Sequence, residues 1–166
     1  MVRIVAWRMT RRWGMAFRIF LDANILLDFT LKRDKNYTTA RQLIEWAVKG
    51  RVQAYVTPAV VQAICQRLVE AYGTERAKEL LLALLAEVQV IDTGHEITVN
   101  ALHSKMNNME DALSYYTALH HKLDYFITRN KNLPKAAIPA LPVCTPEEFL
   151  KHNEEGASIK MKEERN

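Results

Sequence analysis

The sequence predicts an α/β fold, a three-layer αβα sandwich around a parallel five-stranded sheet. Short apolar runs rich in β-branched and aromatic residues alternate with longer stretches of helical periodicity. No internal repeat and no glycine-rich linker divides the chain, and 166 residues suit one domain. Strands separated by helices favour a parallel sheet with both faces covered, because parallel strands need crossover connections.

Each element is expected from its own local pattern. The expected strands are residues 18–24, 52–56, 88–92, 124–128 and 142–144. The expected helices are residues 24–31, 38–49, 58–72, 74–87, 95–105, 110–122 and 145–151. The chain beyond them, from about His152, is charged and is expected to fray.

The helix ends are marked by capping residues. Thr57 and Pro58 supply an N-cap and a first-turn proline, and Gly73 closes the same helix. Thr74 is expected to cap the next helix, and Thr38 or Thr39 to cap the helix that begins there.

The positive charge of the chain lies in its first residues. The net charge is +4, but residues 1–18 carry five arginines and no acid. Subtracting these five from the 23 basic residues leaves 18 against 19 acidic residues, so the pI alone does not predict a polyanion partner. The expected division is a basic extension over 1–17, a domain over 18–150 and a charged tail over 151–166. The extension is interpreted first as an upstream addition before a start at Met15, with an interfacial segment or a nucleic-acid arm as alternatives.

The composition indicates a cytoplasmic protein without a membrane segment. Arginines interrupt every apolar run of the extension, and no run approaches the roughly 20 residues of a membrane span. Cys65 and Cys144 are far apart in sequence and are expected to be reduced. The histidines do not suggest zinc, because the adjacent His120 and His121 would point in different directions from one helix.

Polar residues gather where the predicted strands end, which is where parallel α/β folds bind ligands. Oxygen atoms at this edge would suit Mg²⁺ or Mn²⁺. The residues concerned are Asp22 and Asn24 after the first strand, Glu110 and Asp111 at a helix start, and Thr128 and Asn130 after the fourth expected strand.

Each of these residues also has a purely structural interpretation. Asp22 could cap the following helix, with about even odds for a lone aspartate at a strand end. Glu110 and Asp111 could simply stabilise a helix dipole. Asn130 could be a turn residue in a left-handed conformation. Spacing alone leaves these alternatives open.

Four segments together resemble PIN domains of the VapC-like toxin superfamily. The resemblance covers about residues 18–150, and the segments are RIFLDANILLDF, YVTPAVVQAI, MEDALSYYTALHHKLDYFITRNKNLP and VCTPEEFL. The most specific parts are LDANILLD and the block EDAL…DYFITRN, the latter typical of a branch with E-D-A-L and T-R-N. The resemblance implies the αβα fold and a metal-dependent cut in RNA.

PIN domains commonly use four acids, and the resemblance assigns their positions here. The first falls on Asp22 and the third on Asp111, which Glu110 precedes as a further carboxylate. The second falls on Ala63, beside Gln62, and the fourth on Asn130. The resemblance therefore implies one Mg²⁺ or Mn²⁺ held by Asp22 and Asp111, with Asn24 and Thr128 in support.

The expected function is a divalent-metal-dependent endoribonuclease, the toxin of a toxin–antitoxin pair. Arg129 and Lys131 are expected to contact RNA phosphates. The resemblance implies a homodimer and a cognate antitoxin as partners. The alternative is a catalytically weakened RNA-binding or scaffold domain, since Ala63 and Asn130 replace acids. Phosphatase, receiver and dinucleotide-binding domains are disfavoured, because their second aspartate, final lysine or glycine-rich turn is missing.

Overall fold

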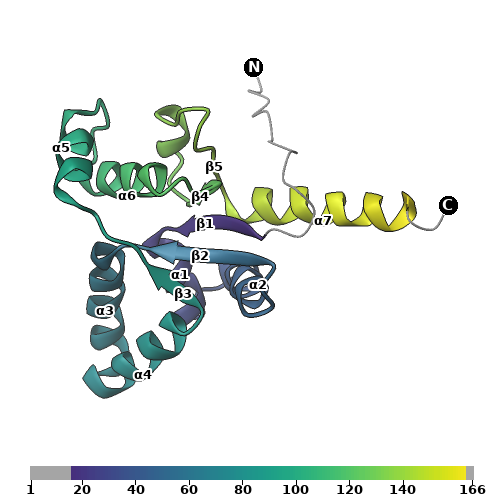
Figure 1. Ribbon diagram of the computed structural model, residues 1–166. Helices are drawn as coiled ribbons and strands as arrows, with labels where there is room; N and C mark the ends of the chain where they lie inside the picture. The colour runs from purple at the N-terminus through teal and green to yellow at the C-terminus, as the bar shows by residue number, and fades with distance from the viewer. Residues whose placement is uncertain (1–15, 164–166) are drawn as a thin grey trace.

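Five parallel strands form the centre of the molecule (Figure 1). The computed structural model describes residues 16–163, and side chains as far as residue 154. The strands lie in the order β3-β2-β1-β4-β5. Their bounds are β1 Phe17–Leu21, β2 Val52–Val56, β3 Val88–Val90, β4 Tyr125–Ile127 and β5 Val143–Cys144. The predicted parallel five-stranded sheet is confirmed.

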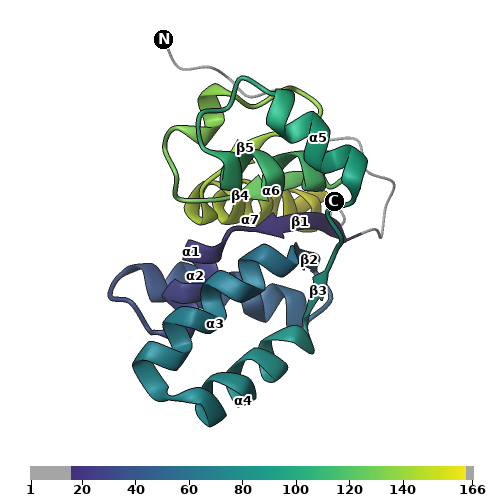
Figure 2. The same ribbon diagram turned by 90° about the vertical axis from the view of Figure 1, so that its left-hand side faces the viewer.

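Helices cover both faces of this sheet. They are α1 Ala23–Thr30, α2 Asn36–Val48, α3 Pro58–Tyr72, α4 Thr74–Leu85, α5 His95–His103, α6 Met109–His120 and α7 Pro146–Glu163, with a 3₁₀ turn at Leu133–Lys135. Figures 1 and 2 show α5 and α6 on the opposite side of the sheet from α3 and α4. The three-layer αβα sandwich is therefore confirmed.

The order in which the chain adds strands to the sheet reverses at β1. From β1 it moves to β2 and β3 on one side, and it then crosses to β4 and β5 on the other. The connections after β1 and β4 consequently diverge, and in such folds ligands bind at the carboxyl ends of the strands where this happens. β1 and β4 pair directly, with Leu21 opposite Ile127, so the residues that follow them start side by side.

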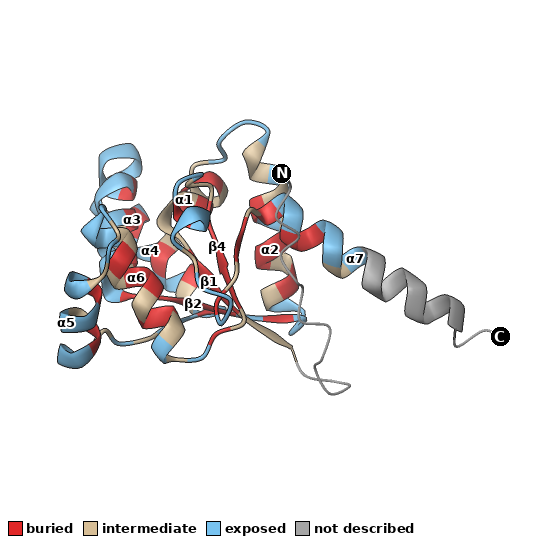
Figure 3. Cartoon of the chain, turned by 90° about the horizontal axis from the view of Figure 1, so that it is seen from above, coloured by how far each residue is buried: buried red, intermediate tan, exposed pale blue. Residues whose placement is uncertain are grey.

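The sheet is the core of the domain, and Figure 3 shows its strands mostly buried. Ile19, Leu21 and Ile127 are fully buried. The rings of Phe20 and Phe126 stack across β1 and β4 with centroids 4.7 Å apart. Burial on both faces explains why the central strands are continuous apolar runs rather than alternating ones.

Two predicted helix N-caps are wrong. α2 begins at Asn36, and Lys35 precedes it without a side-chain cap. The hydroxyl of Thr39 donates instead to Glu147 Oε1 at 2.8 Å, so a tertiary contact uses the group expected to cap the helix. Thr74 is the first residue of α4 and not its cap, because Gly73 occupies the cap position at φ 80°.

The predicted domain was bounded by an N-terminal extension and a charged C-terminal tail. The expected extension lies outside the described residues, apart from Ala16 and from Phe17, which opens β1. The expected frayed tail is wrong up to Glu163, because α7 continues to that residue. Lysine and glutamate are good helix formers, and no proline interrupts the segment. In the part of the chain described, no helix combines the length and apolar character that crossing a membrane requires.

Candidate metal centre

Asp22 is held at the carboxyl end of β1. Its backbone N–H donates to Ile127 O at 3.1 Å, which ties it to the end of β4. Its Oδ1 accepts a hydrogen bond from the N–H of Ala23 at 2.7 Å. The carboxylate therefore interacts with the start of α1, as the capping interpretation expected. It also makes contacts that a cap would not need.

Thr128 joins Asp22 across the two strands. It follows β4, is 2% exposed, and its hydroxyl donates to Asp22 Oδ2 at 2.6 Å. The same hydroxyl oxygen accepts from the backbone N–H of Asn130 at 3.0 Å. Thr128 thereby fixes both the orientation of the Asp22 carboxylate and the turn that leads to Asn130.

Asn130 completes the connection to α6. Its Nδ2 donates to Asp111 Oδ2 at 2.7 Å, while its Oδ1 accepts from the N–H of Asn132 at 3.0 Å. The second bond makes an Asx-turn, so the expected turn role is correct. The left-handed conformation is wrong, because Asn130 is not among the described non-glycine residues with positive φ. One hydrogen-bonded chain thus runs from Asp22 through Thr128 and Asn130 to Asp111.

The two carboxylates of this chain repel one another. Burial raises the pKa of Asp111, and the negative charge of Asp22 raises it further, whereas the hydrogen bond from Asn130 lowers it. Asp111 stands in the first turn of α6, where Asn108 caps the helix by accepting from the Asp111 N–H at 3.0 Å. The like charges mark a place where a cation would be stabilised.

One buried acceptor at this place has no hydrogen-bond partner. Asn24 donates through Nδ2 to Asp22 Oδ2 at 3.3 Å. Its Oδ1 is buried and unpaired. A buried unpaired carbonyl costs free energy unless a ligand or water satisfies it. Two carboxylates and an amide oxygen are hard donors, so this set fits one Mg²⁺ or Mn²⁺ completed by water or phosphate oxygens.

The site contains only two converging carboxylates. Within residues 16–154, no three His, Cys, Asp or Glu side chains come together. Glu110 is exposed and does not join Asp22 and Asp111, although its charge contributes slightly to the raised pKa of Asp111. The expected third carboxylate is therefore not part of the cluster. Ala63 is exposed on α3 and offers no ligand.

Comparison with known families decides the relationship. A family description of the PIN domain matches residues 18–132, more than half of the chain. The chain belongs to the PIN domain family. No curated protein matches it.

Solved structures of toxin–antitoxin proteins have the same fold as this PIN domain. VapBC2 of Rickettsia felis bound to a promoter DNA fragment has a TM-score of 0.58 at 14% identity, covering 78% of this chain and 98% of that one. A Klebsiella pneumoniae toxin–antitoxin complex gives 0.58 at 24%, covering 77% and 97%. Mycobacterium tuberculosis VapC20, a toxin that cleaves the sarcin–ricin loop, gives 0.58 at 17%, covering 72% and 95%.

The two basic residues of the PIN domain's T-R-N loop differ in position. Lys131 is exposed. The Arg129 guanidinium instead lies within the protein, with Nε donating to Asp28 Oδ2 at 2.7 Å and Nη1 donating to Glu147 at 2.9 and 3.1 Å. Arg129 was expected at an RNA phosphate, and Asp28 was not predicted as its partner. The only available signal was a second aspartate in LDANILLD.

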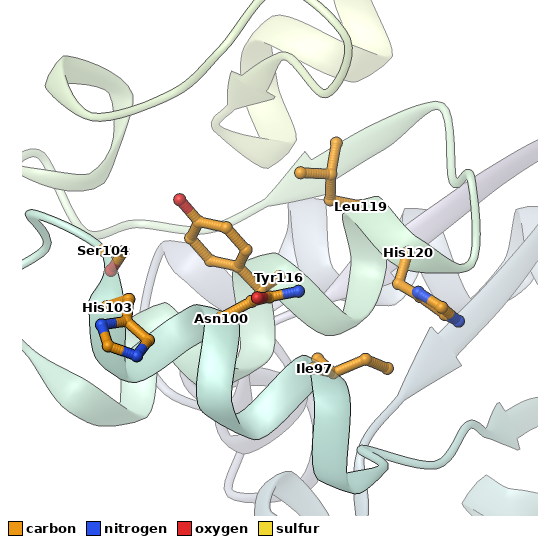
Figure 4. A pocket seen from close by; sticks show the side chains of 7 residues that line it. All are labelled: Ile97, Asn100, His103, Ser104, Tyr116, Leu119 and His120. Atoms are coloured by element: carbon orange, nitrogen blue, oxygen red, sulfur yellow. The ribbon is translucent and has the colours of Figure 1, made fainter.

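A separate hollow of about 380 Å³ lies between α5 and α6 (Figure 4). Tyr116, His103 and His120 are among its lining residues. Tyr116 follows Asp111 by five residues, which places it roughly 140° around α6 from the carboxylate. The hollow is therefore not part of the candidate metal centre.

Proposed function

We propose that this PIN domain is a divalent-metal-dependent endoribonuclease and the toxin of a toxin–antitoxin pair. The proposal rests on the hydrogen-bonded chain Asp22–Thr128–Asn130–Asp111 at the carboxyl ends of β1 and β4. A cation bound here would offset the repulsion between the two carboxylates and could also satisfy the unpaired amide oxygen of Asn24.

Each residue of the centre has a distinct role in the proposed reaction. Asp22 and Asp111 would hold a Mg²⁺ or Mn²⁺ ion, which when bound would supply Lewis-acid chemistry to a phosphate and to an attacking water. Thr128 orients Asp22 by donating to Oδ2, and the unpaired Oδ1 of Asn24 would be available to a water or to the ion. Asn130 keeps Asp111 beside Asp22, because its amide offsets part of the charge repulsion.

The partners in this proposal are RNA and an antitoxin. RNA is supported by the fold shared with a toxin that cleaves the sarcin–ricin loop, and an antitoxin by the fold shared with VapBC2 and the Klebsiella complex. Lys131 is exposed beside the centre and is the candidate phosphate contact. We propose a homodimer in the cytoplasm, where the free thiols of Cys65 and Cys144 would remain reduced.

A second function is favoured by the small number of acids. With Ala63 and Asn130 in place of carboxylates, the site holds less negative charge than four acids would supply. Weak metal binding would leave an RNA-binding or scaffold domain with little catalysis. This candidate predicts RNA binding without a metal-dependent cut.

Metal binding and RNA cleavage separate the two functions. Wild type, Asp22→Asn and Asp111→Asn are titrated with Mn²⁺ by calorimetry and incubated with structured RNA and Mn²⁺. The nuclease proposal expects wild type to bind one ion and cut, and both variants to lose at least about tenfold in affinity, or 1.4 kcal/mol. Asp34→Asn, an exposed aspartate in the loop after α1, is the matched control. Equal Mn²⁺ binding by all four proteins would exclude the metal centre.

A further inference from the structure

We propose that Arg129 and Asp28 are a positioning pair that holds the Thr128–Asn130 loop at the metal centre. The inference depends on the proposed function only in that the loop belongs to a metal centre. It concerns the two charged residues of LDANILLD and T-R-N that the proposed chemistry does not use.

The guanidinium of Arg129 is engaged through all three of its nitrogen atoms. Nε donates to Asp28 Oδ2 at 2.7 Å, and Nη1 donates to both carboxylate oxygens of Glu147 at 2.9 and 3.1 Å. Nη2 donates to Thr39 Oγ1 at 2.9 Å. These partners come from α1, α7 and α2, so one side chain fastens the loop after β4 to three helices.

Burial makes the pair with Asp28 the central one of these contacts. The Asp28 side chain is 5% exposed and that of Arg129 20%, whereas the Glu147 side chain is 48% exposed. A carboxylate that is so far removed from water needs a charged partner. Arg129 could not swing outward to an RNA phosphate without leaving Asp28 buried and unpaired. Its position is therefore set by the protein.

The loop directs neighbouring side chains to different places. Thr128 and Asn130 reach Asp22 and Asp111, whereas Arg129 between them reaches α1, α2 and α7. Because these residues are consecutive, fixing the guanidinium restrains the backbone that presents the hydroxyl and the amide. A free side chain at position 129 would let the loop pivot about Thr128.

The partner helix makes this restraint relevant to the metal ligands. α1 begins directly after Asp22 and carries Asp28 six residues later. The pair thus joins the loop that bears Asn130 to the same helix that starts at Asp22. It fixes the separation between the two sides of the centre, and so the space available to an ion. Catalytic geometry tolerates displacements of only about 0.5 Å.

The test uses the full chain and a signal that needs no metal. Arg129→Ala, Arg129→Lys and Asp28→Asn are compared with wild type by the ¹H–¹⁵N resonances of the Asn130 side-chain amide in EDTA. The three variants are expected to shift this resonance and to increase its hydrogen exchange about tenfold, because the bond to Asp111 is no longer held. Arg129→Lys keeps a cation beside Asp28 but lacks the guanidinium that reaches three partners at once. Because the charge is kept, this variant is less exposed to loss of folding than Arg129→Ala.

A matched control separates positioning from general destabilisation. Leu84→Ala removes a buried side chain on α4, outside the loop and its partner helices. It should lower stability without moving the Asn130 resonance. An equal shift in Leu84→Ala, or an unchanged resonance in all three variants, would overturn the positioning role.

Binding measurements then distinguish the possible roles of Arg129. The proposal expects Mn²⁺ affinity about tenfold lower in Arg129→Ala, the KM for RNA unchanged and kcat reduced. It also expects the salt dependence of RNA binding to stay the same. A decrease of about 0.7 in the slope of log K against log salt would instead identify a phosphate contact and reject the pair. If wild type bound no Mn²⁺ while the Asn130 resonance still shifted, the metal centre would fail and the pair would stand.

Discussion

The mutual repulsion of Asp22 and Asp111 implies a conflict between stability and metal binding. We expect Asp111→Asn to leave the metal-free protein as stable as wild type or slightly more stable, by less than about 1 kcal/mol because the group is partly solvated. The substitution removes a charge but retains an oxygen that can accept from Asn130. Thermal unfolding in EDTA measures this, and the same experiment with Mn²⁺ should stabilise only wild type. A marked loss of stability in EDTA would mean that the carboxylate is structural.

The raised pKa of Asp111 leads us to expect that Mn²⁺ binding at the proposed metal centre depends on pH. Burial and the Asp22 charge favour the protonated carboxyl, so protons compete with the ion. We expect Mn²⁺ affinity to decrease as the pH falls through this raised pKa. Calorimetry in buffers of different ionisation enthalpy should then detect proton release near that pH. Affinity that does not change down to about pH 4, the usual aspartate range, would contradict the shift.

The raised pKa of Asp111 also determines how this residue changes protein stability with pH. A carboxyl whose pKa is higher in the folded state lowers stability above the unfolded pKa, and acidification relieves this cost. Glu147 has the opposite sign. Burial opposes its ionisation, but hydrogen bonds from Thr39 and from Arg129 lower its pKa overall, so its contribution is lost as the pH falls through that lowered value. Acid should therefore relieve the repulsion between Asp111 and Asp22 and weaken the contact of Glu147 with Arg129.

Among individual residues, the sequence predicted which polar side chains lie together at the strand ends better than it predicted the contacts that support them. Asp22, Thr128 and Asn130 follow paired strands, so a correct sheet was enough to bring them together. Arg129 was assigned to RNA because its type and its place in the loop suit a phosphate. Its true partner lies 101 residues away in sequence, and no local pattern indicates such a contact.

Capping supplies a prediction for α3. Thr57 is 2% exposed, and its hydroxyl oxygen accepts from the N–H of Val60 at 3.3 Å. We expect Thr57→Ala to lower the free energy of unfolding by about 1 kcal/mol, as is typical for loss of an N-cap. Urea denaturation measures it. Thr38→Ala, at an exposed position in the first turn of α2, should change stability by less than about 0.5 kcal/mol.

The exposed side of α3 allows a test of the missing acid. Ala63 occupies the place where PIN domains resembling this one carry a glutamate, and it is exposed. We expect Ala63→Glu to raise Mn²⁺ affinity several-fold, and Asn130→Asp combined with it to raise affinity further, because each adds a negative oxygen ligand. Calorimetry decides this. Gln62→Glu, the exposed neighbour, is the control, and an equal gain there would indicate only a general charge effect.

Helix ends were predictable where the signal was local. Pro58 and Gly73 mark α3 through backbone restrictions that do not depend on the rest of the fold. The start of α2 was wrong because the hydroxyl of Thr39 is used by α7 and by Arg129. Tertiary contacts that draw on a capping residue cannot be recognised from the residues around it.

The order of strands explains why the candidate site lies at the carboxyl ends of β1 and β4. In β3-β2-β1-β4-β5 the chain leaves the centre in both directions, so only β1 and β4 adjoin the point of reversal. The alternation of strands and helices predicted the layers. The pairing of β1 with β4 could not be predicted in this way, because periodicity does not determine strand order.

The location of the described core and of the candidate ligands leads to a prediction for the basic extension. The main apolar core is built from residues between Ile19 and Leu150, and the candidate ligands lie between Asp22 and Asn130. We expect a chain that starts at Met15 to unfold at the same temperature as the full chain and to bind Mn²⁺ equally. Differential scanning calorimetry and titration measure both quantities.

The same truncated chain tests the alternatives for the four arginines that it lacks. If the extension is an addition without a role in binding, the slope of log K against log salt for single-stranded RNA should be unchanged. If the extension were an arm that neutralised four phosphates, its removal would instead reduce the magnitude of that slope by about 2.8, because each contact contributes about 0.7. Removing residues 1–14 takes away four of the 23 basic residues and no acid, which leaves 19 basic and 19 acidic residues. A loss of slope would therefore assign RNA attraction to the extension, and an unchanged slope would assign it to exposed residues of the domain such as Lys131.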